Sequence, residues 1–226
     1  AVYGEDAGTE RLIPFDIDEF INIHVGNRTL PALLEALPLA SAIPLTWRMF
    51  GNAGVLGISD RPVTETFTRA APVPLHWPWR AMMFKTLYRN DGSYRKLGVH
   101  RPRNPDPDRA QGRRWFDGSG RELPPAYHDK RIFLDPGADP FRLVQLNHYA
   151  LGSVEGFLVK CDRGRANQTG EPFSMDYWVE RNFNQEEDRT VLALDSTDAR
   201  DDLHADPVLG RLHAGALAWR KARFEA

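Results

Sequence analysis

The sequence predicts an α/β fold, because short apolar runs alternate with stretches of helical periodicity. Four runs, Leu12–Phe20, Ala42–Phe50, Met82–Arg89 and Phe141–Leu146, have the length and composition of strands. Between and after these runs, apolar residues recur three or four positions apart, as on one face of a helix. Strands that alternate with helices are typical of the α/β class, and 226 residues suffice for one large domain or two small ones.

The N-terminal half of the chain contains one predicted helix and one further predicted strand. Thr29 can cap a short helix that carries Leu30, Leu33, Leu34 and Leu37 on its apolar face, and Pro38 ends it. The stretch Val63–Arg69 alternates as a strand does.

The segment from residue 101 to residue 140 differs in composition from the rest of the chain. It is rich in Pro, Asp, Gly and Arg and has few periodic apolar residues. We therefore expect a long surface loop, with a hairpin around Trp115–Arg121.

Three helices are predicted in the C-terminal third. Ser153 can cap the first of them, in which Val154, Phe157, Leu158 and Cys161 are expected to face the core. The second runs from Asp176 through Phe183. The pair Asp206–Pro207 is a good cap and first-turn combination for the last helix, which is expected to end near Arg223.

Composition excludes several classes of protein. With 42% hydrophobic and 27% charged residues, the chain resembles an ordinary soluble domain, and a net charge of −2 gives no general attraction to nucleic acid. Cys161 is the single cysteine, so an intramolecular disulfide and a cysteine-based zinc site are excluded. Nothing in the sequence approaches the apolar length of a transmembrane segment.

An acidic cluster of Asp16, Asp18 and Glu19 ends the first apolar run. In an extended chain Asp16 and Asp18 point to the same side, because side chains alternate with a period of two. Two neighbouring carboxylates repel each other unless a positive charge joins them. A cation that prefers oxygen ligands, Mg²⁺ or Mn²⁺, is the simplest candidate. The alternative is a solvated loop, because Asp-x-Asp is common by chance.

His148 follows the predicted strand Phe141–Leu146. If this strand and the first run are parallel neighbours, His148 reaches the same sheet edge as Asp16 and Asp18. An imidazole among the ligands favours Mn²⁺ over Mg²⁺. The alternative is a structural histidine with no ligand.

Four cationic residues are candidates for binding a phosphate-bearing ligand, namely Arg48, Lys85, Lys160 and Arg163. Lys85 is the stronger candidate, because a lysine inside an apolar run needs a partner. For Lys160 and Arg163 the alternative is a solvated helix face.

Trp47 and Trp77 are candidates for stacking on a sugar ring. For Trp77, and for Trp79 near it, a place in the hydrophobic core is the alternative.

Together these residues resemble a known family, the family-2-like bacterial glycosyltransferases of the GT-A fold whose members carry an Asp-x-Asp-Glu-Phe sequence. The chain is also similar to the galactan synthases. The resemblance extends to about Asp188. It is carried by Leu12–Phe20, Trp47–Gly51, Leu146–Tyr149, Lys160, Arg163-Gly164, Asp176–Trp178 and Arg181–Asn184.

The resemblance implies a GT-A-like mixed sheet flanked by helices and a metal-dependent hexosyltransferase of polysaccharide biosynthesis. Such an enzyme moves a sugar from a nucleotide-sugar donor to a glycan or other hydroxyl acceptor, and the resemblance favours inversion. Asp16, Asp18 and His148 would hold Mn²⁺ or Mg²⁺, and Glu19 or Asp176 would be the catalytic base. The expected location is the cytoplasm, with a peripheral place at the inner membrane as the alternative.

The resemblance also sets expectations about domains. Only fifteen residues precede Asp16, so we expect the N-terminal nucleotide-binding half of such enzymes to be missing. Residues 1–190 would form the partial catalytic region, and residues 191–226 a helical extension. Two other functions remain open, a metal-dependent phosphodiesterase or other hydrolase, and a non-catalytic carbohydrate-binding module that uses Trp77 and Trp79.

Overall fold

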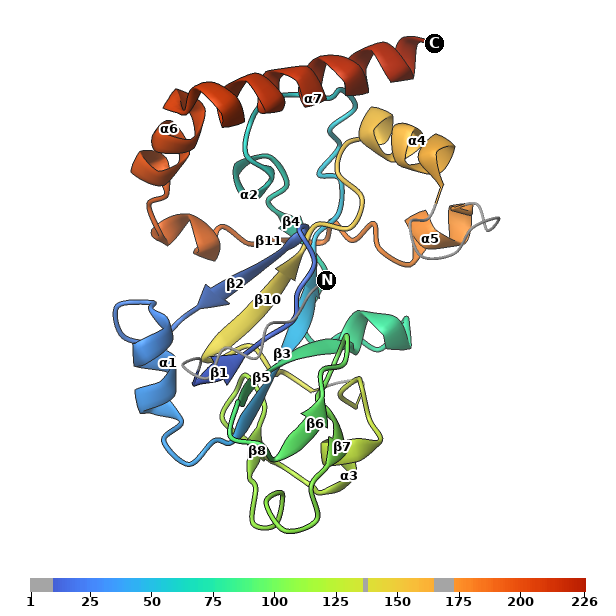
Figure 1. The fold of residues 1–226 in the computed structure, drawn as a ribbon. Coiled ribbons are helices and arrows are strands. Elements are labelled where there is room, and N and C mark those ends of the chain that lie inside the picture. The colour runs from blue at the N-terminus through green and yellow to red at the C-terminus, as the bar shows by residue number, and fades with distance from the viewer. Residues whose placement is uncertain (1–9, 136–137, 165–172) are drawn as a thin grey trace. The chain divides into compact units, whose positions relative to one another are not determined.

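The fold is mixed α/β, as the sequence predicts (Figure 1). A computed structural model describes residues 10–135, 138–164 and 173–226. Contacts divide the chain into two compact units, of which the first combines Ala1–Arg48 with Val73–His148. The second combines Met49–Pro72 with Tyr149–Ala226. The expected boundary at residue 190 lies inside the second unit, and it stays a prediction.

A mixed sheet is the centre of the first unit, and seven strands belong to it within the described ranges. These strands are β1 (Arg11–Leu12), β2 (Glu19–Ile23), β3 (Ala42–Met49), β5 (Phe84–Arg89), β8 (Trp115–Phe116), β9 (Glu122–Leu123) and β10 (Val144–His148). The order across the sheet is β1-β5-β3-β10-β2, and β8 pairs with both β3 and β9. The pair β3–β8 is parallel, whereas β1–β5, β3–β5, β8–β9 and β2–β10 are antiparallel.

Shorter elements complete the first unit. The helix predicted after Thr29 is α1 (Leu30–Ala36), in which Leu33 is buried, as expected, and Leu37, also buried, is the C-cap residue. Leu30 is 40% exposed, and the side chain of the N-cap residue Thr29 makes no capping hydrogen bond, so these two expectations are wrong. The remaining elements are a 3₁₀ turn (Trp79–Met82), the antiparallel pair β6 (Tyr94–Lys96) and β7 (Arg103–Pro105), and α3 (Ala126–Asp129).

The prediction of one strand over Leu12–Phe20 is wrong. β1 ends at Leu12, a turn contains Ile17 and Asp18, and β2 begins only at Glu19. Proline lacks the N–H that a strand donates to its neighbour, so Pro14 interrupts the pairing. The side chain of Ile17 is fully exposed, which shows that the alternation of apolar residues here does not reflect burial.

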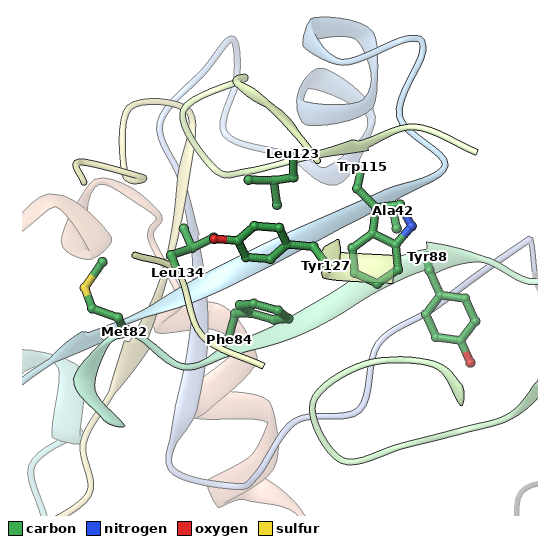
Figure 2. Close-up of a cluster of buried hydrophobic side chains, with 8 residues drawn as sticks. All are labelled: Ala42, Met82, Phe84, Tyr88, Trp115, Leu123, Tyr127 and Leu134. Atoms are coloured by element: carbon green, nitrogen blue, oxygen red, sulfur yellow. The ribbon is translucent and has the colours of Figure 1, made fainter. Parts of the chain in front are cut away.

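The segment 101–140 is a loop only in part. The predicted hairpin is confirmed, because β8 and β9 pair in antiparallel register. However, four large side chains from this segment are buried in one hydrophobic cluster with residues of β3, β5 and the 3₁₀ turn (Figure 2). The members of the cluster are Ala42, Met82, Phe84, Tyr88, Trp115, Leu123, Tyr127 and Leu134. Two strands of two residues, a helix of four residues and a loop carry these four side chains, and such short elements have no sequence period that marks them as core.

The second unit contains most of the helical residues that the structure describes. Its elements are α2 (Val63–Thr66), β4 (Arg69–Ala70), α4 (Val154–Arg163), α5 (Met175–Val179), β11 (Glu186–Glu187), a 3₁₀ turn (Thr190–Ala193), α6 (Thr197–Ala205) and α7 (Pro207–Glu225). Two predicted caps are confirmed. The side chain of Ser153 accepts a hydrogen bond from Gly156 N, and that of Asp206 accepts from the backbone of the first turn of α7.

Three predictions for this unit are wrong. Val63–Arg69 is not a strand, because a short helix follows Pro62, whose carbonyl accepts hydrogen bonds from both the backbone and the hydroxyl of Thr66. The helix expected to continue through Phe183 ends at Val179. Of the residues expected on the core face of α4, Phe157 is buried as expected, whereas Leu158 is 49% exposed because the buried face includes Gly156 and Val159 instead.

None of the helices within the described ranges combines the length and the apolar character that crossing a bilayer requires.

Candidate functional site

Residues Asp16–Glu19, here called the acidic turn, and the end of β10 meet at one edge of the sheet in the first unit. This part of the sheet is called the acidic edge. In the antiparallel register of β2 and β10, Glu19 lies opposite His148. The Nε2 atom of His148 is 3.8 Å from Oδ1 of Asp18. Asp16 joins this turn through its carbonyl, which accepts a hydrogen bond of 3.1 Å from Glu19 N. The structure therefore brings together the three residues predicted as metal ligands.

The strand arrangement that places these residues near one another differs from the predicted one. We expected parallel strands whose carboxyl ends carry all three residues. Instead the two acids precede β2, and β2 runs antiparallel to β10, so that the start of one strand lies beside the end of the other (Figure 1).

Glu19 is a buried hydrogen-bond acceptor that connects two segments of the site. Its side chain is 0% exposed. Its Oε1 accepts a hydrogen bond of 2.7 Å from Nε1 of Trp47, and its Oε2 accepts one of 2.8 Å from the backbone N–H of Asp16. Burial raises the pKa of this carboxyl from 4.5 to about 7, although the hydrogen bonds and Lys85 oppose the rise. Glu19 thus joins β3 to the acidic turn.

Lys85 is the positive partner of this acidic edge. It lies in β5 and is 1% exposed. Its Nζ is 3.1 Å from Oδ2 of Asp16 and 3.7 Å from Oε1 of Glu19. The expectation that a lysine in an apolar run needs a partner is thus met by two carboxylates, which lie on the chain's own acidic turn.

An aromatic group packs beside the carboxylates. The ring of Trp47 lies 4.4 Å from that of His148 and 5.7 Å from that of His100, measured between centroids. Nδ1 of His100 is 3.0 Å from the carbonyl of Phe84, and burial lowers the pKa of His100. Sequence reasoning missed His100, because it lies in a polar stretch with no period to mark it.

The other candidates in the first unit differ in accessibility. Arg48 is buried, and its guanidinium lies 5.5 Å from the centroid of the Phe141 ring. Trp47 is also buried, whereas Trp77 is 57% exposed, so that Trp77 can contact a ligand in solution. Trp79 is exposed too, and the core alternative is therefore wrong for both tryptophans of this segment.

Three candidates belong to the second unit. Lys160 is not part of a solvated helix face, because its Nζ donates a hydrogen bond of 2.8 Å to the Ala150 carbonyl and lies over the rings of Phe173 and Tyr177. Arg163, in the last turn of α4, and Asp176, in the first turn of α5, are exposed.

The predicted metal ligands do not form a three-ligand centre in this structure. Among the described residues, no three His, Cys, Asp or Glu side chains are placed so that they could hold a metal ion. Asp18 and His148 lie close to each other, but the carboxylate of Asp16 is bound to the ammonium of Lys85. The residues therefore do not fit the expected Mn²⁺ or Mg²⁺ site in this conformation.

Comparison with models of protein families finds no match, and comparison with curated proteins finds no significant match.

The raised pKa of Glu19 predicts how stability depends on pH. The carboxyl ionises near pH 4.5 in the unfolded chain and near pH 7 in the folded one, so the folded state binds more protons between these values. We expect Glu19 to lower the free energy of unfolding by about 2–3 kcal/mol as the pH rises through this window, with no further loss above it. Urea unfolding of the wild type and of Glu19→Gln between pH 4 and pH 8 measures this contribution. A difference between the two proteins that stays constant over the range would contradict it.

Proposed function

We propose that the chain is the catalytic region of a glycosyltransferase that moves a sugar from a nucleotide-sugar donor to a hydroxyl acceptor. One observation carries the proposal. Segments far apart in the sequence, which contain Asp16–Glu19, Trp47, Lys85 and His148, converge on one edge of a single sheet. Three of these segments, Leu12–Phe20, Trp47–Gly51 and Leu146–Tyr149, also carry the sequence resemblance to family-2-like glycosyltransferases.

Accessible side chains of the first unit set the proposed roles. Asp16 has a side chain that is 65% exposed, and that of Asp18 is 33% exposed, so both can contact the donor. The imidazole of His148 is buried beside Asp18, so its proposed role is to position that carboxylate. Trp77, which is exposed, offers a flat apolar surface for a sugar ring.

Transfer needs a base for the acceptor. The acceptor oxygen attacks the anomeric carbon, its proton passes to a carboxylate, and the bond from the sugar to the diphosphate breaks. Of the two carboxylates predicted as the base, Asp176 is exposed, whereas Glu19 is buried with both oxygens in hydrogen bonds. The proposal therefore gives Glu19 a positioning role. Asp176 belongs to the second unit, and its role as the base stays a prediction.

The proposal predicts release of a nucleoside diphosphate from a nucleotide-hexose when a glycan acceptor is present. Asp18→Asn should lower this rate by roughly 10- to 100-fold, because a carboxylate accepts hydrogen bonds from the hydroxyls of the sugar more strongly than an amide does. A panel of nucleotide-hexoses, followed by chromatography of the nucleotide product, measures the rate. Asp108→Asn, which changes an exposed aspartate elsewhere in the first unit, is the matched control and should retain the full rate.

Other outcomes of the same assay contradict the proposal. Release of free sugar or phosphate at an equal rate without acceptor would identify a hydrolase. If no nucleotide-hexose is consumed and none raises the melting temperature, the chain lacks a donor site.

The exposure of Trp77 and Trp79 supports a second candidate, a non-catalytic carbohydrate-binding module. This function predicts that oligosaccharides bind without any nucleotide. It also predicts that Trp77→Ala abolishes this binding while Asp18→Asn leaves it unchanged, which titration calorimetry with oligosaccharides can distinguish.

A further inference from the structure

The position that a cation would take on the acidic turn is already filled by a side chain. Sequence reasoning required a positive charge between the carboxylates and suggested a divalent metal ion. In the structure the ammonium of Lys85 is that charge, 3.1 Å from Asp16 and 3.7 Å from Glu19. At such separations, opposite charges attract far more strongly inside a protein than they do in bulk water.

Burial fixes the ammonium of Lys85 beside the acidic turn. Lys85 is 1% exposed and lies within β5, which pairs with β3 on one side and with β1 on the other. If the ammonium left Asp16, it would stay buried with the more distant carboxylate of Glu19, 3.7 Å away, and a buried charge that loses a partner is costly. The fold therefore favours the closed pair over its release.

Asp16 can act as a metal ligand only if this pair opens. A divalent ion that approached Asp16 Oδ2 would lie close to a positive charge that cannot move into solvent, and the two charges repel. Asp18 and His148 remain as neighbouring groups, but two ligands are fewer than structural or catalytic metal sites use.

We propose that Lys85 is a built-in counter-ion that takes the place of a divalent metal at Asp16 and keeps the metal affinity of this edge low. The inference rests on the ion pair and on the burial of Lys85. It holds whether or not the chain transfers a sugar, so its failure and the failure of the proposed function can be told apart.

Calorimetric titration with Mn²⁺ alone tests the inference. Lys85→Met keeps the length of the side chain and removes its charge, so Asp16 becomes available. We expect this variant to bind Mn²⁺ at least about tenfold more tightly than the wild type, since the repulsion removed is worth more than the ~1.4 kcal/mol of a tenfold change. Lys96→Met removes an exposed lysine of the same unit and should bind Mn²⁺ as the wild type does. Equal Mn²⁺ affinity in Lys85→Met and the wild type would overturn the inference.

A second variant keeps the test valid if Lys85→Met does not fold. In the wild-type background, Asp16→Asn should change the Mn²⁺ affinity less than about twofold, because the ion pair already keeps Asp16 from the metal. A loss of tenfold or more would show that Asp16 binds Mn²⁺ in the presence of Lys85, and the inference would be wrong.

Discussion

Replacing Glu19 with alanine is expected to lower the free energy of unfolding by roughly 2–4 kcal/mol, because two donors lose their acceptor at once. The Nε1–H of Trp47 and the backbone N–H of Asp16 both donate to this carboxylate. Lys85 would also keep only the largely exposed Asp16 as its partner. Urea unfolding at pH 7 measures the loss.

Two further variants show whether the acceptor atoms of Glu19 cause this effect. Glu19→Gln keeps an oxygen for Trp47, so it should lose less stability than Glu19→Ala. Glu225→Ala, which changes an exposed glutamate at the end of α7, should stay within about 0.5 kcal/mol of the wild type. If the alanine variants at 19 and 225 were equally stable, Glu19 would not hold the acidic turn to β3.

Replacing Trp115 with alanine should be more destabilising still, by about 3–5 kcal/mol. Trp115 is 0% exposed and belongs to the hydrophobic cluster of Figure 2. Its Nε1 donates a hydrogen bond of 3.2 Å to the hydroxyl of Tyr94, and its ring stacks on His128. The substitution removes this packing and leaves a cavity, which chemical denaturation detects as a lower midpoint.

The matched control is Trp77→Ala, which removes the same side chain from an exposed position. It should change the free energy of unfolding by about 0.5 kcal/mol or less. Similar losses in the two variants would mean that the segment 101–140 does not contribute to the core of the first unit.

Much of the regular structure follows from the sequence, because the relevant signals are local. The strand predicted over Ala42–Phe50 is β3, and eight consecutive buried residues explain its continuous apolar run. Ser153 and Asp206 mark helix starts, because a side-chain oxygen can satisfy the free N–H groups of a first turn without help from the rest of the fold.

The errors arise where distant contacts decide the local structure. Asp16, Ile17 and Asp18 alternate as a strand would, yet they form a turn because Glu19 binds the backbone of Asp16 and is itself bound by Trp47. The sequence could identify the acids and His148 as candidates, but not Lys85 as the partner of Asp16. That ion pair joins residues 69 positions apart, and no local pattern records it.

The division of the chain has a practical consequence for dissecting the molecule. Each compact unit is made of two separate stretches, since the polypeptide passes between units after Arg48, Pro72 and His148. A fragment that ends at His148 would keep Met49–Pro72 without the stretch that completes its unit. Neither unit can therefore be expressed alone by shortening the chain at one terminus. To isolate the unit that contains the acidic edge, Met49–Pro72 must be replaced with a short linker and Tyr149–Ala226 must be removed.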